Sequence, residues 1–217
     1  MSITPSPPTV KLKSRVIVYV DGFNLYFGIR DHGWRRYLWL NLQRLAENLL
    51  LPDQGLVATK YFTSRVRYPS DKQQRQSVYL DALATLPSPG FQIFYGHYLA
   101  IPRNCRHCGR ADMVPSEKMT DVNIAVEMLS DAYQDSFDTA LLISADSDLG
   151  APLRKIRALF PNKRVVLAFP PSRRSSELEK LAASAFGIGR QALRNSQFAD
   201  PLMTASGYVL TKPPSWK

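Results

Sequence analysis

Two apolar runs of this chain have the pattern of β-strands, and each is followed by aspartates. Residues 141–143 form a wholly apolar run, and Asp146 and Asp148 come shortly after it. Residues 16–20 are β-branched or aromatic and lead directly to Asp21. Residues at the carboxyl ends of parallel strands line the crevice in which open α/β sheets bind their ligands. Carboxylates delivered to that crevice suit the coordination of a hard divalent cation.

The same acids also have a structural interpretation. Ser147 and Asp148 are both of a type that caps helices, and apolar spacing predicts a helix over residues 149–160. Asp21 followed by Gly22 has the form of a turn that ends a strand. From these residues alone, capping and metal binding are equally supported.

A fourth aspartate, Asp121, lies in the first turn of the helix predicted over residues 120–133. Residues at helical spacing predict the buried face of this helix: Val122, Ala125, Val126, Leu129, Ala132 and Tyr133. Asp121 also has a structural interpretation, because an acid in the first turn interacts favourably with the helix dipole, here beside a Thr120 cap. The helix feeds the fourth predicted strand, which in a doubly wound sheet can neighbour the first. We therefore expect all four carboxylates in one crevice, where oxygen ligands without histidine or thiol favour Mg²⁺ or Mn²⁺.

Strand-like runs alternate with helical spacing along the chain. Strands are predicted over residues 15–20, 56–63, 91–95, 138–143, 164–168 and 186–188, and helices over 25–29, 41–51, 71–86, 120–133, 149–160 and 177–185. This alternation predicts one three-layer α/β/α domain over residues 15–198, with a mainly parallel sheet. Residues 1–14, rich in proline, serine and threonine, are expected to be a disordered arm, and residues 199–217 a tail.

The charge balance favours a polyanionic partner, nucleic acid before an anionic membrane. The formal net charge is +10, and a basic periphery around an acidic, metal-holding crevice suits the cleavage of a phosphodiester. Arg35 and Arg36 lie in a loop with aromatic neighbours, a pattern that suits stacking on unpaired bases and neutralisation of phosphates. In this loop Trp39 fits a core position equally well. Arg173 and Arg174 form a second basic loop.

Several other classes of protein are excluded or disfavoured. No apolar run approaches the ~20 residues of a membrane span, and the N-terminus has no apolar signal core. We therefore expect a cytoplasmic protein without membrane contact. The glycine patterns of dinucleotide-binding and P-loop proteins are absent, since residues 187–189 lack the third glycine and no G-K-[ST] occurs.

Two cysteines, Cys105 and Cys108, stand in a basic segment, residues 96–118, that we expect to be an irregular loop. A C-x-x-C pair is half of a common zinc site. A structural Zn²⁺ completed by His97, a carboxylate or another subunit is one interpretation. A plain loop with reduced thiols is the other.

Three motifs, in this order, resemble the NYN domain family of PIN-like, metal-dependent nucleases. They are Val-Asp-Gly-Phe-Asn-Leu-Tyr at residues 20–26, Lys-Met-Thr-Asp-Val-Asn-Ile-Ala at 118–125 and Leu-Ile-Ser-Ala-Asp-Ser-Asp-Leu at 142–149. The resemblance extends over about residues 15–195. It implies a PIN-like fold and an endoribonuclease that depends on Mg²⁺ or Mn²⁺. Related folds often pair, so a homodimer is compatible with it.

Carried over position by position, the resemblance implies a metal-binding role for the four aspartates, Asp21, Asp121, Asp146 and Asp148. It implies that Asn24 orders the metal water or the scissile phosphate and that Ser144 positions a site carboxylate or water. Lys118 is implied to contact phosphate. Some related domains bind RNA without cutting it, so the alternative is a catalytically inactive RNA-binding or adaptor protein of the same fold.

Overall fold

Six parallel strands form the central sheet of the computed structural model, which describes residues 13–66, 68–88, 90–104 and 111–217. In spatial order the strands are β3 (Phe91–Tyr95), β2 (Gln54–Thr63), β1 (Ser14–Asp21), β6 (Thr139–Ile143), β7 (Arg164–Phe169) and β8 (Ser184–Gly187). All neighbouring pairs are parallel. The strand order reverses between β1 and β6, so the predicted first and fourth strands are indeed neighbours at the topological switch point.

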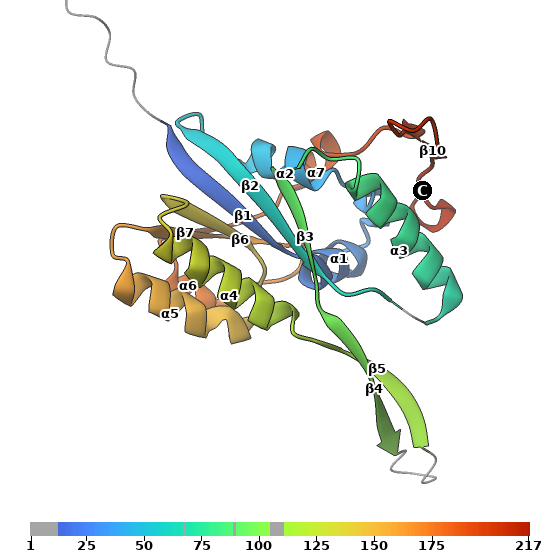
Figure 1. The fold of residues 1–217 in the computed structure, drawn as a ribbon, viewed down its shortest axis with the longest axis horizontal. Helices are drawn as coiled ribbons and strands as arrows, with labels where there is room; N and C mark the ends of the chain where they lie inside the picture. The colour runs from blue at the N-terminus through green and yellow to red at the C-terminus, as the bar shows by residue number, and fades with distance from the viewer. Residues whose placement is uncertain (1–12, 67, 89, 105–110) are drawn as a thin grey trace, which may run out of the picture.

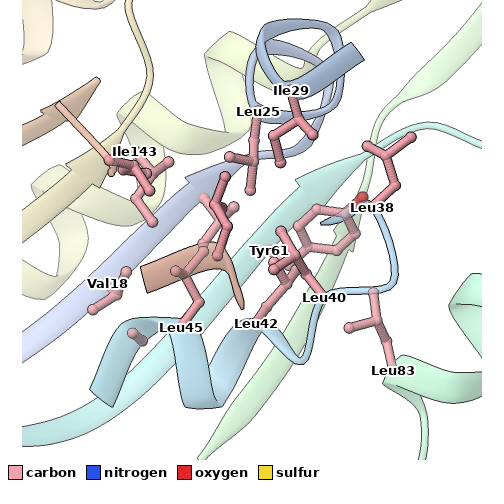
Figure 2. Packing of buried hydrophobic residues seen from close by; sticks show 14 of the residues in the cluster. Val18, Leu25, Ile29, Leu38, Leu40, Leu42, Leu45, Tyr61, Leu83 and Ile143 are labelled. Atoms are coloured by element: carbon pink, nitrogen blue, oxygen red, sulfur yellow. The ribbon is translucent and has the colours of Figure 1, made fainter. Parts of the chain in front are cut away.

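Helices cover both faces of the sheet (Figure 1). One layer contains α1 (Gly22–Asp31), α2 (Leu42–Leu49), α3 (Ser70–Leu83) and α7 (Arg190–Asn195), and the other α4 (Thr120–Tyr133), α5 (Gly150–Leu159) and α6 (Ser176–Leu181). Because successive side chains of a strand point to opposite faces, β1 contributes Val18 to one core and Tyr19 to the other. Figure 2 shows the first of these cores, to which β1 contributes Val18, α1 contributes Leu25 and α2 contributes Leu45. The expected three-layer α/β/α fold is confirmed.

Helix α4 has the predicted bounds, but its predicted buried face is only partly correct. Ala132 is buried as predicted, and Ile124 and Met128 face the core beside it, while Val122, Val126 and Tyr133 are exposed. Both stripes have helical spacing, so periodicity alone does not choose between them. The sheet selects the stripe that also carries Asp131, whose carboxylate has a buried partner on β2.

The described parts of residues 96–118 are not the irregular loop that we expected. They form the antiparallel strand pair β4 (His97–Asn104) and β5 (Ala111–Lys118), which extends away from the central sheet (Figure 1). A two-stranded ladder is held by backbone hydrogen bonds, so it does not require an apolar periodicity in the sequence. Cys105 and Cys108 lie outside the described residues, as does the side chain of Lys118.

The segment after residue 198 is also not a tail. It contains the short pair β9 (Leu202–Met203) and β10 (Val209–Leu210) and a 3₁₀ turn, η3 (Pro214–Trp216). Trp216 is only 5% exposed. Its ring centroid lies 5.7 Å from that of Tyr79 on α3 and 6.5 Å from that of Tyr26 on α1. One aromatic anchor fastens the segment to the domain without producing a periodic pattern.

Replacing Trp216 by alanine should therefore destabilise the domain. The loss of a buried tryptophan side chain costs about 3 kcal/mol when its cavity cannot fully collapse, and for a chain of this size we expect the melting temperature to fall by roughly 6–12 °C. Thermal and urea unfolding measure the change. Tyr208→Ala removes an exposed ring of the same segment and should have almost no effect. Equal stability of both variants and the parent would show that the segment is not anchored through Trp216.

The helices of the described ranges are short. The longest, α3 and α4, have 14 residues each, and none of the described helices combines the length and apolar character of a bilayer span.

Candidate active site

The carboxyl ends of β1 and β6 meet at the switch point of the sheet. Val20 pairs with Ile143, so Asp21 and Ser144 follow neighbouring strands at the same edge. Asp21 ends β1 and also caps α1, with its side chain only 4% exposed. The edge therefore holds a buried carboxylate beside the loop that carries the other two acids of this motif.

A chain of hydrogen bonds joins Asp21 to that loop. The Ser144 hydroxyl donates to Asp21 Oδ2 at 2.8 Å, and the Asp146 amide donates to Ser144 Oγ at 3.1 Å. The backbone N–H of Asn24 donates to Asp21 Oδ1 at 3.0 Å, and the side-chain Oδ1 of Asn24 accepts from the backbone N–H of Ala145 at 3.1 Å. These bonds connect the β1–α1 corner to the segment after β6 at two places, and they set the Asp146 backbone two hydrogen bonds from the Asp21 carboxylate.

Helix capping at this corner differs from the expectation that Ser147 or Asp148 is the cap. A 3₁₀ turn, η2 (Ser147–Leu149), precedes α5, and Asp146 caps it by accepting from the Asp148 amide at 3.1 Å. Because this turn begins at Ser147, before the helix predicted over residues 149–160, the capping residue is Asp146. Asp146 is half-buried and Asp148 is exposed.

The expected cage of four carboxylates is not formed. Asp121 is half-buried in the first turn of α4, and α4 packs against η2 at the edge that carries Asp21. Among the described residues, however, no three histidine, cysteine, aspartate or glutamate side chains are grouped closely enough to hold a metal ion. The structure thus links Asp21 and Asp146 through Ser144, while Asp121 and Asp148 stand on separate turns.

The donor set at this corner still fits Mg²⁺ or Mn²⁺. The side chains linked by the hydrogen bonds, Asp21, Asn24 and Ser144, offer oxygen ligands, and Asp146 adds a second carboxylate. Mg²⁺ usually keeps several water ligands and is held by one or two carboxylates together with substrate phosphates, rather than by a full protein cage. Two carboxylates at an open strand edge match that mode of binding.

Gly22 allows α1 to start this close to β2. A Cβ atom at Gly22 would lie 2.6 Å from Tyr61 Cε2 and 2.7 Å from the Phe62 carbonyl oxygen. Burial raises the pKa of Tyr61 to about 12, and the negative charge of Asp21 adds to this effect. Tyr61 is therefore a neutral phenol at physiological pH and does not serve as a base in this site.

The second basic loop that we singled out in the sequence follows β7, the neighbour of β6, and carries Arg173 and Arg174. Arg173 forms an ion pair with Asp31 at 3.4 Å, and Arg174 forms one with Glu179 at 2.8 Å. The Arg174 side chain is 70% exposed and that of Arg173 is 33% exposed, so Arg174 is the more accessible of the two to a phosphate.

The first basic loop differs from its expected role as a base-stacking surface. Arg35 and Arg36 are exposed in a 3₁₀ turn, η1 (Arg35–Tyr37), but Tyr37 and Trp39 are buried in the core. Trp39 also donates from Nε1 to the Ala199 carbonyl at 3.0 Å. Of the two interpretations of Trp39, the structure selects the core.

A buried ion-pair cluster lies under α4, where the sequence pattern predicts none. Lys60 of β2 is 7% exposed, and its Nζ lies 2.6 Å from Glu127 Oε2 and 2.7 Å from Asp131 Oδ2. The Tyr19 hydroxyl donates to Asp131 Oδ2 at 2.6 Å, and burial together with the Asp131 charge raises the Tyr19 pKa well above its ordinary value. The cluster ties β1 and β2 to α4. Two features of the sequence could have indicated this cluster. Lys60 interrupts an apolar strand, and Glu127 and Asp131 are four residues apart on one helix.

Comparisons with known proteins bear on this arrangement. The family model described as "NYN domain" matches residues 15–188. The curated protein "6-hydroxy-3-succinoylpyridine 3-monooxygenase HspA" of Pseudomonas putida (strain DSM 28022 / S16) is 27% identical over 178 residues, which are 66% of this chain and 56% of that protein. This chain therefore spans little more than half the length of that relative. The monooxygenase activity in the name is a property of that relative.

A solved structure has the same fold. It is the crystal structure of a protein of unknown function, VPA0982, from Vibrio parahaemolyticus RIMD 2210633. The TM-score is 0.54 at 19% sequence identity, over 84% of this chain and 98% of the other.

Proposed function

This chain belongs to the NYN domain family, whose model matches most of its length, and we propose that it is a Mg²⁺- or Mn²⁺-dependent endoribonuclease. The nuclease-like domain of this family implies a hydrolase that acts on nucleic acid. The observation that carries the proposal is the hydrogen-bonded bridge from Asp21 through Ser144 to Asp146, across the switch point of the sheet. It ties the buried Asp21 carboxylate to the backbone amide of Asp146, whose own side chain is half-buried, at the edge where such sheets bind ligands.

In this proposal Asp21 and Asp146 hold the ion, with Asp121 and Asp148 as further acids on the same edge. When bound, a divalent ion supplies activation of water and stabilisation of the charge that develops on the phosphodiester. Ser144 and Asn24 orient the Asp21 carboxylate through the bonds described above. RNA is the proposed partner, in the cytoplasm, and a homodimer stays a prediction that the elution volume of the purified chain can test.

The experiment that tests the function is a titration of Mn²⁺ and Mg²⁺ against labelled RNA. We expect cleavage that saturates with the metal ion and stops on addition of EDTA. A circular single-stranded RNA, which has no ends, should also be cut if the enzyme is an endonuclease. Salt-sensitive binding of RNA without any turnover at any metal concentration would instead support the catalytically inactive RNA-binding protein of the same fold.

The loop after β7 should contribute to RNA affinity through phosphate contacts. The double variant Arg173→Gln/Arg174→Gln should bind single-stranded RNA more weakly. Its slope of log affinity against log salt concentration should be shallower by roughly 1.4, since each lost phosphate contact removes about 0.7. Filter binding in EDTA at several salt concentrations measures both quantities.

A matched control is Arg157→Gln on α5. Arg157 is also exposed but lies in the last turn of its helix, at the end remote from η2. This control should leave the salt slope unchanged. An unchanged slope in the double variant as well would remove Arg173 and Arg174 from the RNA-binding surface.

A further inference from the structure

A cavity of about 260 Å³ lies between α1 and α3, on the face of the sheet opposite α4. Much of its wall is aromatic: Tyr26, Phe27, Tyr61, Tyr68, Tyr79 and Trp216. Figure 2 shows part of the apolar wall, where Leu25 and Ile29 of α1 project toward the Tyr61 ring. The volume is somewhat below the roughly 300–1,000 Å³ of pockets for drug-sized ligands, so the cavity suits a single ring system.

One end of the cavity is built by the strand edge that carries the candidate active site. Gly22 and Thr63 both line it. Gly22 follows Asp21 directly, and Thr63 is the last residue of β2, the neighbour of β1. A ligand in the cavity therefore lies next to the Asp21 corner.

Cationic side chains surround this aromatic interior. Arg30, Lys72 and Arg75 all belong to the lining. Arg30 is paired with Asp31 at 2.7 Å and Arg75 with Asp71 at 2.6 Å, whereas no ion pair of Lys72 occurs among the described residues. The Arg30 guanidinium also stands 4.5 Å from the centroid of the Phe27 ring. Aromatic walls with cations at their border are the combination by which proteins hold unpaired bases and their phosphates.

We propose that this cavity binds one unstacked base of the RNA, with the attached phosphate at Lys72. The inference rests on the proposed function, because it assigns a base-binding subsite to the same RNA substrate. A base seated there places the adjoining backbone at the Asp21 corner. The cavity then selects single-stranded or unpaired RNA, since a base in a duplex is not free to enter it.

Two exposed residues of the lining allow a test that does not endanger the fold. Tyr68 is 78% exposed, and Lys72 is also exposed. Tyr68→Ala should weaken the binding of nucleoside 5′-monophosphates roughly tenfold, the size of one base-stacking contribution. Lys72→Glu should weaken the monophosphates by a similar factor but leave the binding of the uncharged nucleosides unchanged. Isothermal titration calorimetry with the four monophosphates and the four nucleosides, in EDTA, measures these affinities.

Matched controls lie on the opposite face. Tyr133→Ala removes a tyrosine on α4 that is 82% exposed, and Lys155→Glu reverses an exposed lysine on α5. Both controls should bind every nucleotide as the parent does. The inference is overturned if no monophosphate binds the parent chain, or if all four variants bind equally well.

The same measurements separate this inference from the nuclease proposal. Because EDTA removes divalent ions, the binding of the monophosphates in the cavity is measured without any cleavage. A chain that binds them through Tyr68 and Lys72 yet never cleaves RNA would retain the cavity site and lose the nuclease. A chain that cleaves RNA with Mn²⁺ but shows no effect of Tyr68→Ala or Lys72→Glu would retain the nuclease and lose the cavity site.

Discussion

Asp21→Asn should lower the rate of Mn²⁺-dependent RNA cleavage by roughly 10²- to 10³-fold, the usual effect of removing one electrostatic group from an active site. The substitution removes a negative charge from the carboxylate that is buried at the switch point. Asparagine keeps the shape of the side chain, so the loss should appear in the rate and in the affinity for Mn²⁺. Single-turnover cleavage and calorimetric titration with Mn²⁺ measure the two effects.

The fold should survive this substitution because its hydrogen bonds can be rearranged. The side-chain oxygen of the new asparagine can still accept from the backbone N–H of Asn24, as Asp21 Oδ1 does now at 3.0 Å. The new amide nitrogen would face Ser144 Oγ, and a hydroxyl can accept as well as donate. Asp146→Asn should also lower the rate, because it removes the second carboxylate proposed to hold the ion. It should leave the fold intact, since the backbone N–H of Asp146 can still donate to Ser144 Oγ.

The control for both variants is Asp81→Asn, which removes an exposed carboxylate from α3. It should cleave RNA at the rate of the parent chain. Undiminished cleavage by purified Asp21→Asn and Asp146→Asn, both correctly folded, would refute the assignment of the site to this corner.

Lys60→Met should be the most destabilising substitution away from the site, at roughly 3–5 kcal/mol, because it leaves buried carboxylates without their cation. Asp131 is 7% exposed and would keep only the Tyr19 hydroxyl as a partner among the contacts described here. Urea unfolding gives the free energy. Lys155→Met, an exposed lysine on α5, is the matched control and should stay within about 0.5 kcal/mol of the parent.

A second variant separates lost charge balance from lost packing. Adding Glu127→Gln and Asp131→Asn to Lys60→Met removes the uncompensated charges, and much of the stability should return, because neutral replacements of buried ion pairs are often tolerated. If the triple variant is no more stable than Lys60→Met, the lysine acts through packing of its aliphatic chain. If Lys60→Met itself is as stable as the parent, the cluster does not support the fold.

Most of the predictions that the structure confirms rest on patterns among neighbouring residues. The strand at residues 91–95 and the helix at 120–133 have the predicted bounds, and Asn41, with which the helix predicted over residues 41–51 begins, caps α2. Short apolar runs and helical spacing are properties of neighbouring residues, so they survive in any fold that buries them. The order of these elements also restricts a parallel sheet to few topologies, which is why β1 and β6 could be expected side by side.

The amino-acid order alone was therefore enough to indicate a doubly wound sheet and to direct attention to Asp21 and Asp146 at its edge. It could not reveal that Ile124 and Met128, rather than Val122 and Val126, face the core, nor that Lys60 is buried against Asp131. Nor did it anticipate that Trp216 closes back onto α1 and α3 and helps to form a cavity there. Each of these outcomes depends on contacts between residues far apart along the chain, and such contacts exist only after the layers have packed.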